Sequence, residues 1–315
     1  MNLQHLKQQF QNGTLGKPDF IAQALQAHRR LFDYVGITQS TDVREILIAP
    51  EGVSFIVGDE RIRLFCPPEE ARVAPIEVMN FDRYEPDETR VMDLLAAGAR
   101  NILDIGANIG WYSIRFAKRM PQVRVHAFEP MPVTYDYLQR NVAANQVGPQ
   151  VSCFNYGLSE SSGTVNFFIS PTSGTNASLL NVSGTQDARA VVGLTLTLDE
   201  WVRNQALAPD FIKCDVEGAE LLVFRGGRET LAKHQPIVFA ELLRKWSKPF
   251  GYHPNDMLGF FAELGYVCYA VGPDGVRPLR EVSDTTPETN YAFLHQDKHA
   301  AAIARLQPLR NPRHG

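Results

Sequence analysis

Hydrophobic positions in the first part of the chain follow two different spacings. In residues 19–36, DFIAQALQAHRRLFDYVG, apolar residues recur at roughly helical spacing, so residues 1–40 are predicted to be helical. Residues 44–65 instead contain three short β-forming runs, REILIAP, VSFIVG and RIRLFCPP, separated by the turns PEG and GDE. This pattern predicts a β-meander, and residues 1–75 are predicted to form a helical and β appendage.

From about residue 86 the pattern alternates between strand-like and helix-like segments. The strand-like runs include NILDIG, VRVHAFEP, VSCFNYGLS, FIKCDVEG and PIVFAELL, with helical patterns between them, among them a helix AELLVFRGGRETLAKH. Such alternation predicts a doubly wound α/β domain with a parallel sheet, here over residues 76–299, followed by a tail at 300–315. The segment joining YVCYAVG to the last strand, NYAFLH, has no clear helix, which predicts an antiparallel pair at one edge.

One polar segment in this domain has no clear periodicity. The segment is SPTSGTNASLLNVSGTQD, and a loop of this length is often a binding loop or a lid. It is predicted to be either a substrate cover, with Ser173, Thr175 and Asn176 bonding to a polyol, or a surface loop.

Composition narrows the class of protein. The chain has 315 residues, 44% of them hydrophobic, and a net charge of −4, so a folded core is expected and no basic stripe suggests duplex nucleic acid as a partner. The four cysteines form no CxxC pair, which argues for a reducing compartment. The polar N-terminus and the lack of a long apolar run predict a cytoplasmic protein without a membrane span.

The stretch NILDIGANIGWYSI, residues 101–114, carries the clearest chemical signal. A strand leads into a turn bracketed by Gly106 and Gly110, and ligands of parallel sheets bind where such strands end. Glycine allows close backbone approach, and the following helix offers free N–H groups. A carboxylate at Asp104 would repel a dinucleotide pyrophosphate but attract a cation, which favours S-adenosylmethionine over NAD.

A second acid supports this interpretation. Glu129 ends the next strand, where a carboxylate can accept both ribose hydroxyls of a nucleotide. NAD enzymes also place an acid here, so the combination of Asp104 with Glu129 is the signal, and neither residue discriminates by itself.

With these motifs in place, the chain resembles the FkbM-type S-adenosylmethionine-dependent methyltransferases. The resemblance covers about residues 80–295 and rests on YEPDETRVM at 84–92, LDIGANIGWYS at 103–113, HAFEPMPVTYDYLQRNVAAN at 126–145, SGTNASL at 173–179 and FIKCDVEGAELLVFRGG at 211–227. It implies a class I methyltransferase sheet, Rossmann-like, with seven strands of which the last is antiparallel. It also implies O-methylation of a hydroxyl, often on a sugar, a glycolipid or another natural product.

The resemblance implies roles for several residues. Asp104, Gly106 and Gly110 would line the methionine part of the cofactor, Glu129 would hold the ribose, and the segment around Gly157 and Leu158 would lie near the adenine. The predicted cofactor site comprises Glu88, Asp104, Gly106, Ala107, Asn108, Gly110, Glu129, Pro130, Gly157, Leu158 and Asp215. Of these, Glu88 and its neighbour Glu85 precede the first helix of the domain, where they either cap it or contact the cofactor as part of a lid.

Methyl transfer to an alcohol needs positioning and a group that takes the proton. The strand FIKCD delivers Asp215 and Glu217 to the carboxyl edge of the sheet, and IVFAE delivers Glu241. These acids could supply a base, or Asp215 and Glu241 could bind a divalent cation, although Asp215 and Glu217 could equally be helix caps. His253 is a further candidate base, and Lys213 is predicted to pair with an acid.

Three alternatives stay open at this point. The same fold could methylate nitrogen or carbon, although the Asn/Asp-Pro-Pro-Tyr element typical of base methylation does not occur. A nucleotide-dependent oxidoreductase is disfavoured by Asp104 and by the absence of GxGxxG after the strand. A non-catalytic nucleotide-binding protein of this fold is the third. The expected partners are a small-molecule or glycan substrate and, in a homo-oligomer, a second subunit. The appendage could contact that subunit, contact a carrier or modify substrate access, and the sequence does not choose between them.

Overall fold

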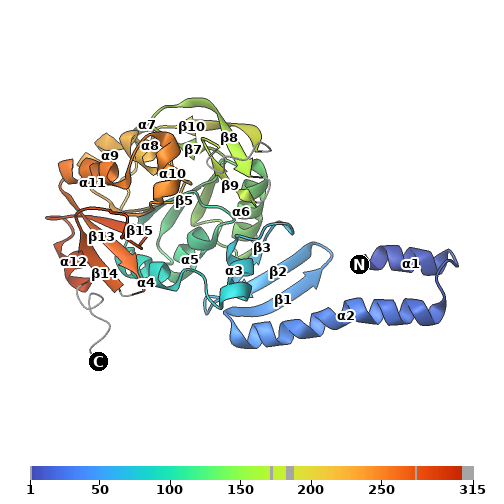
Figure 1. Ribbon diagram of the computed structural model, residues 1–315. Helices are drawn as coiled ribbons and strands as arrows, with labels where there is room; N and C mark the ends of the chain where they lie inside the picture. The colour runs from blue at the N-terminus through green and yellow to red at the C-terminus, as the bar shows by residue number, and fades with distance from the viewer. Residues whose placement is uncertain (1, 171–172, 182–187, 274, 307–315) are drawn as a thin grey trace.

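The computed structural model describes residues 2–170, 173–181, 188–273 and 275–306, and the side chains at 170 and 173–176 lie outside this description as well. One large sheet forms the centre of the molecule, with helices on both faces and two smaller sheets beside it (Figure 1).

The large sheet has eight strands in the order β14-β13-β15-β12-β11-β4-β5-β6. They are β4 (Asn101–Ile105), β5 (Arg124–Phe128), β6 (Val151–Phe154), β11 (Phe211–Cys214), β12 (Ile237–Glu241), β13 (Tyr266–Gly272), β14 (Gly275–Leu279) and β15 (Asn290–His295). Strands β6, β5, β4, β11 and β12 pair in parallel, whereas β15 is antiparallel to both β12 and β13. The predicted doubly wound sheet with its last strand antiparallel is therefore confirmed.

Strand β14 adds a hairpin to the edge of that sheet. It pairs antiparallel with β13 and lies in the connection that carries no helical pattern. The sequence did not predict it, because Arg277 and Pro278 interrupt its apolar pattern. The antiparallel strand β15 lies between β12 and β13, so it is not an edge strand.

Both faces of the sheet are buried by helices. Adjacent residues of one strand belong to different cores: Ile102 packs in one and Leu103 in the other. The helices are α4 (Pro86–Leu95), α5 (Trp111–Arg119), α6 (Pro132–Ala144), α7 (Leu198–Gln205), α8 (Glu220–Arg225), α9 (Arg228–His234), α10 (Arg244–Ser247), the 3₁₀ turn η1 (Lys248–Phe250), α11 (Pro254–Glu263) and α12 (Ala300–Leu306). The chain reverses its direction along the sheet between β4 and β11, and this switch point positions the site.

The segment AELLVFRGGRETLAKH, predicted as one helix, forms two helices, α8 and α9. The prediction of a single continuous helix is therefore wrong. The break falls at Gly226 and Gly227. A Cβ on Gly226 would lie 2.2 Å from the carbonyl oxygen of Ser159, so the backbone must approach its neighbour closely here.

A second sheet stands above the carboxyl edge. Strands β7 (Gly157–Leu158), β8 (Gly163–Ser170), β9 (Ser173–Ser178) and β10 (Arg189–Leu196) lie in the order β7-β10-β8-β9. The expectation of an irregular loop is wrong for β9, which forms by antiparallel pairing with β8 and not by apolar patterning. The predicted polyol contacts of Ser173, Thr175 and Asn176 lie outside the described side chains.

The appendage contains the predicted helices and meander. Helices α1 (Leu3–Gln11) and α2 (Lys17–Ser40) project from the body beside β1 (Val43–Ala49) and β2 (Gly52–Val57), with β3 (Ile62–Phe65) and α3 (Ala74–Phe81) following (Figure 1). Two side chains of α6 bond to the backbone of β3: Asn141 to both N and O of Phe65, and Asn145 to both N and O of Arg63. The outer strand of the meander is therefore joined to the body; the domain boundary at residue 75 stays a prediction.

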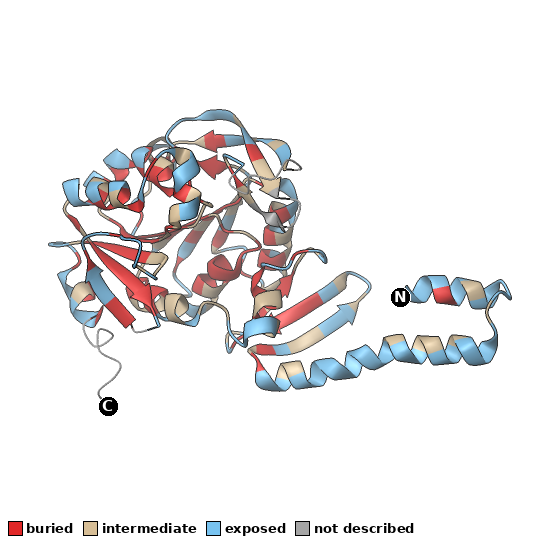
Figure 2. Cartoon of the chain, viewed as in Figure 1, coloured by how far each residue is buried: buried red, intermediate tan, exposed pale blue. Residues whose placement is uncertain are grey.

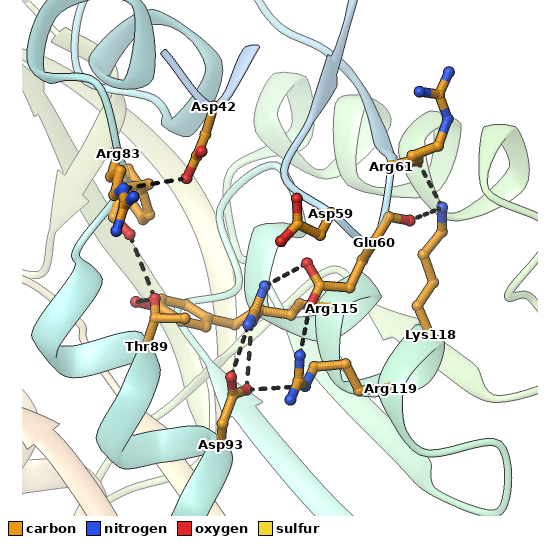
Figure 3. A network of polar contacts seen from close by, with 12 residues as sticks. Asp42, Asp59, Glu60, Arg61, Arg83, Thr89, Asp93, Arg115, Lys118 and Arg119 are labelled. Atoms are coloured by element: carbon orange, nitrogen blue, oxygen red, sulfur yellow. Dashed lines mark hydrogen bonds and ion pairs between the residues drawn. The ribbon is translucent and has the colours of Figure 1, made fainter. Parts of the chain in front are cut away.

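A charged network fixes the turn between β2 and β3 to the body (Figure 3). Arg115 on α5 donates to Glu60 at 2.7 Å and to Asp93 on α4 at 2.7 Å, and these side chains are only 11–18% exposed. Lys118 donates to the carbonyl oxygens of Glu60 and Arg61. Burial would raise the pKa of Glu60, but the hydrogen bond from Arg119 and the charge of Arg115 hold it below its usual value.

Burial follows this organisation (Figure 2). The strands of the large sheet are mostly buried, whereas α2 has no buried residue. In the part of the chain that the structure describes, no helix combines the length and the hydropathy needed to cross a membrane.

Candidate functional site

A cavity opens at the carboxyl ends of β4, β5 and β11, at the switch point of the sheet. Its lining comes from all three strand ends and from the second sheet above them. The lining residues are Tyr84, Ile105, Gly106, Ala107, Asn108, Trp111, Tyr112, Phe128, Glu129, Pro130, Gly157, Leu158, Phe167, Ala177, Leu179, Lys213, Asp215, Val216, Glu217 and Ala219. The structure thus brings together most of the residues that the sequence proposed for a cofactor.

The turn after β4 brings backbone close to the cavity. Gly106 has φ +76°, and a Cβ there would lie 1.8 Å from the carbonyl oxygen of Asp215, so no other residue fits without moving β11. Asn108 also has a positive φ, and its side chain accepts a bond from the N–H of Ile109 at 2.8 Å. Gly110 begins α5 at φ +94° against Leu138 and does not line the cavity, so its position there is explained by the turn itself.

Glu129 is held in a fixed orientation at the cavity wall. Its Oε2 accepts the N–H of Asn108 at 3.1 Å, and its Oε1 accepts the N–H of Met131 at 2.9 Å. The residue is 4% exposed, and burial raises its pKa to about 7 even though both hydrogen bonds act against that shift. Each carboxylate oxygen can still accept one more hydrogen bond, which suits a pair of adjacent hydroxyls.

Asp104 lies beneath the cavity and not in its lining. It is fully buried, and its Oδ2 accepts a bond from Ser113 at 2.5 Å. Its Oδ1 makes no hydrogen bond within the described residues and lies 3.5 Å from Nζ of Lys213. The predicted direct contact between Asp104 and a cofactor therefore stays a prediction, while its pairing with Lys213 is present in the structure.

Lys213 connects the floor of the cavity to its acids. Its Nζ donates to the carbonyl oxygen of Gly106 at 2.8 Å and lies 3.7 Å from Asp215, so the predicted pairing of Lys213 with an acid is confirmed. Burial alone would lower the pKa of Lys213, but the charges of Asp215 and Asp104 hold it above its usual value. This lysine is therefore a permanent buried cation among carboxylates.

Acids from three segments of the chain converge beside Lys213. Asp215 and Glu217 line the cavity, and Glu241, at the end of β12, interacts electrostatically with both. Burial, followed by the charge of Asp215, raises the pKa of Glu217 and of Glu241. Glu85 joins this acid group, because burial raises its pKa to about 7 and the charge of Asp215 adds to the shift.

The structure separates Glu85 from Glu88. Glu85 accepts a bond from the hydroxyl of Tyr112 at 2.5 Å, within the cavity region. Glu88 instead accepts a bond from Asn290 at 3.3 Å and does not line the cavity. The predicted role of Glu88 in cofactor binding stays a prediction, and the left-handed backbone at Glu85, φ +42°, was not predictable from local sequence.

Tyr84, Tyr112 and Phe167 are cavity residues that the sequence did not select. Burial raises the pKa of both tyrosines well above the usual value, so both stay neutral donors. Tyr84 belongs to the YEP motif, which was a usable signal, whereas Phe167 comes from β8 and carried none. Trp111 and Tyr112 belong to the hydrophobic core, and both also line the cavity.

His253 lies away from the cofactor cavity. Its Nδ1 accepts the N–H of Asn255 at 3.2 Å and its own N–H donates to Asp256, so it caps α11. It lines a separate open groove together with Lys245, Lys248 and Tyr252. The structure thus explains His253 as a capping residue, and its predicted catalytic role is untested.

Metal ligation was also predicted for Asp215 and Glu241. Over residues 2–170, 173–181, 188–273 and 275–306, no group of three or more His, Cys, Asp or Glu side chains has the arrangement of a metal site. The two acids lie at the ends of adjacent strands, Asp215 directly after β11 and Glu241 as the last residue of β12.

Comparison with known proteins identifies the family. Residues 104–268 match the methyltransferase FkbM domain, which is just over half of the chain and contains the cavity turn, Glu129 and the acids after β11 and β12. The chain therefore belongs to the FkbM methyltransferase family, whose cofactor is S-adenosylmethionine.

Three relatives are similar over the same region. Methyltransferase sdnD of Sordaria araneosa is 32% identical over 182 residues, 49% of this chain and 69% of the relative. The hexuronic acid methyltransferase AglP of Haloferax volcanii is 32% identical over 145 residues, covering 46% and 56%. The 2-O-methyltransferase NoeI of Sinorhizobium fredii is 30% identical over 161 residues, covering 46% and 64%. The chain thus spans a little over half to about two thirds of each.

Solved structures show weaker similarity. The methyltransferase FkbM from Methylobacillus flagellatus has 18% identity and a TM-score of 0.40, over 62% of this chain and 43% of that protein. An O-methyltransferase from Bacillus cereus in complex with SAH has 15% identity and a TM-score of 0.40, over 68% and 82%.

The residues of the cavity fit S-adenosylmethionine. The cofactor carries an ammonium and a sulfonium. The carboxylates of Asp104 and Asp215 supply negative charge that the single cation of Lys213, 3.5 and 3.7 Å from them, only partly balances. Glu129 is oriented for ribose hydroxyls, and Phe128 and Leu158 offer apolar surface for a base. Gly106 contributes backbone to the cavity wall, where the absence of a side chain lets the turn approach the carbonyl oxygen of Asp215.

Proposed function

We propose that this methyltransferase transfers the methyl group to a hydroxyl of a sugar-containing or related natural-product acceptor. The observation that carries the proposal is the group of carboxylates, Asp215, Glu217 and Glu241, beside the cofactor cavity. An alcohol must lose its proton on methylation, and such a group is equipped to take it. The names of two relatives, a hexuronic acid methyltransferase and a 2-O-methyltransferase, agree with this choice.

The cofactor supplies an electrophilic methyl group when it is bound. Glu129 would then accept the ribose hydroxyls, and Gly106 and Asn108 would present backbone to the methionine part. Ala107, Pro130, Gly157 and Leu158 also line the cavity. Gly110 does not contact the cavity and contributes indirectly, by fixing the turn that carries Gly106 and Asn108.

Glu217 is the proposed base. It lines the cavity, its left-handed backbone at φ +55° fixes its direction, and burial together with Asp215 raises its pKa. A carboxylate with a raised pKa is a stronger base once it is ionised, and a positively charged ligand beside it favours the ionised form. Glu241 interacts electrostatically with Glu217, and burial with the charge of Asp215 raises its own pKa as well.

The second sheet is the proposed cover of the reaction. Phe167 on β8, Ala177 on β9 and Leu179 line the cavity from above, so they exclude water from the methyl group. Acceptors would enter from the side of Glu217 and Glu241.

The proposal extends to metal and location. A divalent cation shared by Asp215 and Glu241 would lower the pKa of an acceptor hydroxyl, and loss of activity in EDTA with recovery in Mg²⁺ would support it. A cytoplasmic location is supported by the four free cysteines.

The test is methyl transfer from S-adenosylmethionine to a panel of hexuronic acids, neutral sugars and amines, read by mass spectrometry. We expect products that are methylated on oxygen, and loss of at least about 100-fold in kcat for Glu217→Gln, because a positioned base contributes that much. Glu229→Gln, on exposed α9, is the matched control and should keep full activity. Methylation of amines alone, or an unchanged kcat in Glu217→Gln, would contradict the proposal.

A further inference from the structure

Helix α2 carries large apolar side chains of the kind that helices usually bury, but these side chains are exposed to solvent. It has 24 residues, and none is buried. Large apolar side chains on it are half exposed or more: Ile21 53%, Leu25 55%, Leu31 52%, Phe32 73% and Val35 53%. In Figure 2 this helix is almost entirely exposed along its length, in contrast to the body. An apolar surface of this size on a monomer usually marks an interface.

The short helix α1 covers only the first part of α2. Phe10 stacks on Phe20 with ring centroids 4.7 Å apart, and Leu3 lies beside a small hollow formed with Ala27 and Arg30. Leu6 is the only residue of α1 that is buried. Within the described residues, the surface from Leu31 to Val35 therefore has no cover.

The exposed positions follow the spacing of a helix–helix seam. Positions 21, 25, 28, 32 and 35 are separated by four, three, four and three residues, and four of them are apolar, with His28 in the middle. At 3.6 residues per turn, Asp19, Arg30 and Asp33 lie on the opposite side of the helix. The seam is therefore free of charge along its length, as a protein partner requires.

The size and charge of this surface favour a second copy of the chain. The exposed parts of Ile21, Leu25, Phe32 and Val35 amount to roughly 500 Å², more than half of the roughly 800 Å² that each partner buries in a stable complex. One surface serves both copies in a two-fold dimer, so the seam is its own complement. A membrane surface is less suited, because Arg29 and Arg30 are balanced by Asp19 and Asp33.

We propose that two copies of the chain dimerise through α2, with the stripe Ile21, Leu25, His28, Phe32 and Val35 at the contact. The α1–α2 hairpins of both copies then form a small four-helix arrangement that stands apart from the two cofactor cavities. This assembly is independent of the reaction proposed above, since no residue of α1 or α2 lines the cavity.

The test is sedimentation velocity of the full chain over a range of micromolar concentrations. The wild type is expected to be a dimer. Leu25→Glu and Phe32→Glu, one turn or more apart, should each raise the dissociation constant at least about 30-fold, because each places a charge in the contact. Gln26→Glu adds the same charge on the polar side and should leave the dimer unchanged.

Folding of each variant is checked separately by calorimetric titration with S-adenosylhomocysteine, which should bind all of them equally. A wild type that stays monomeric, or a dimer that persists in both charged variants, would overturn the proposal. A monomeric wild type that sediments with anionic vesicles would overturn it in favour of a membrane surface.

Discussion

Replacing Lys213 by methionine tests whether this lysine is the counter-ion of the buried carboxylates at the site. Methionine keeps much of the length and packing of the lysine but removes its charge. Asp104, which is 0% exposed and 3.5 Å from Nζ, then loses its only cationic neighbour among the described ion pairs, and Asp215 loses one at 3.7 Å. Removing one partner of a buried pair typically costs about 3–5 kcal/mol. Because Asp215 is 37% exposed and partly hydrated, we expect Lys213→Met to lower the free energy of unfolding by about 3 kcal/mol, the lower end of that range.

The assay is urea unfolding of Lys213→Met and wild type at several pH values. The charge of Lys213 lowers the pKa of Glu85 and of Glu129, so in the variant these carboxyls take up protons at higher pH, and as the pH falls their protonation relieves the repulsion. The destabilisation should therefore be largest near pH 8 and shrink toward pH 5. The wild type should also lose stability as the pH rises, because the pKa of Glu129 is raised in the folded state. The stability that the protonated form of Glu129 contributes is present below pH 4.5 and lost as the pH rises through about 7.

Lys233→Met on α9 is the control, since Lys233 is exposed and the substitution is the same. It should change the free energy of unfolding by less than about 0.5 kcal/mol. A loss below about 1 kcal/mol in Lys213→Met, or a loss that does not vary with pH, would refute the view of Lys213 as the buried counter-ion of the site.

Other positions give shorter tests. In Glu129→Ala, calorimetry should show the binding free energy for S-adenosylmethionine weakened by roughly 1–3 kcal/mol. In the wild type, the affinity should decrease as the pH is lowered through about 7, because Glu129 becomes protonated. Equal binding by the variant and the wild type would argue against the ribose contact. Gly106→Ala should abolish cofactor binding, because its Cβ would lie 1.8 Å from a backbone oxygen; normal binding would show that the turn can move. Arg115→Ala should lower the free energy of unfolding by about 3–5 kcal/mol in urea, and a change near zero would mean that the network contributes little. His126→Leu should stabilise the protein by about 1–3 kcal/mol, because neither ring nitrogen has a hydrogen-bond partner among the residues that the structure describes. Burial lowers the pKa of His126 to about 4, so wild-type stability should fall from pH 6.5 through 4 and this part of the loss should be missing in the variant.

The sheet and most of the cavity were predictable because their signals are local. Alternation of strands and helices predicts the layers, and an acid at the end of the second strand predicts the position of Glu129. Gly106 is recognisable because a turn from strand to helix beside a ligand requires glycine. The cavity lining confirms the location of these residues.

Features that depend on the register between strands were not predictable. Lys213 lies directly opposite Asp104 in the pairing of β11 with β4, and both side chains point to the same face. That pairing draws Asp104 beneath the cavity, and nothing in the sequence near residue 104 reveals it. The same holds for Glu85, which joins the acid group only because a left-handed residue turns the chain before α4.

Features that form by pairing and not by apolar patterning were also missed. Strand β9 is polar and forms against β8, and β14 forms a hairpin with β13 despite Arg277 and Pro278. The break between α8 and α9 depends on the distance from Gly226 to Ser159, two segments far apart in the sequence.

The central claim is that the cavity between β4, β5 and β11 binds a methyl donor and not a dinucleotide. The direct measurement is calorimetric titration of the wild-type protein with S-adenosylmethionine, S-adenosylhomocysteine and NAD. The account predicts binding of the first two and none of NAD, because carboxylates beside the turn attract the cations of the methyl donor and repel a pyrophosphate. Binding of NAD without binding of S-adenosylmethionine would contradict the account at its root.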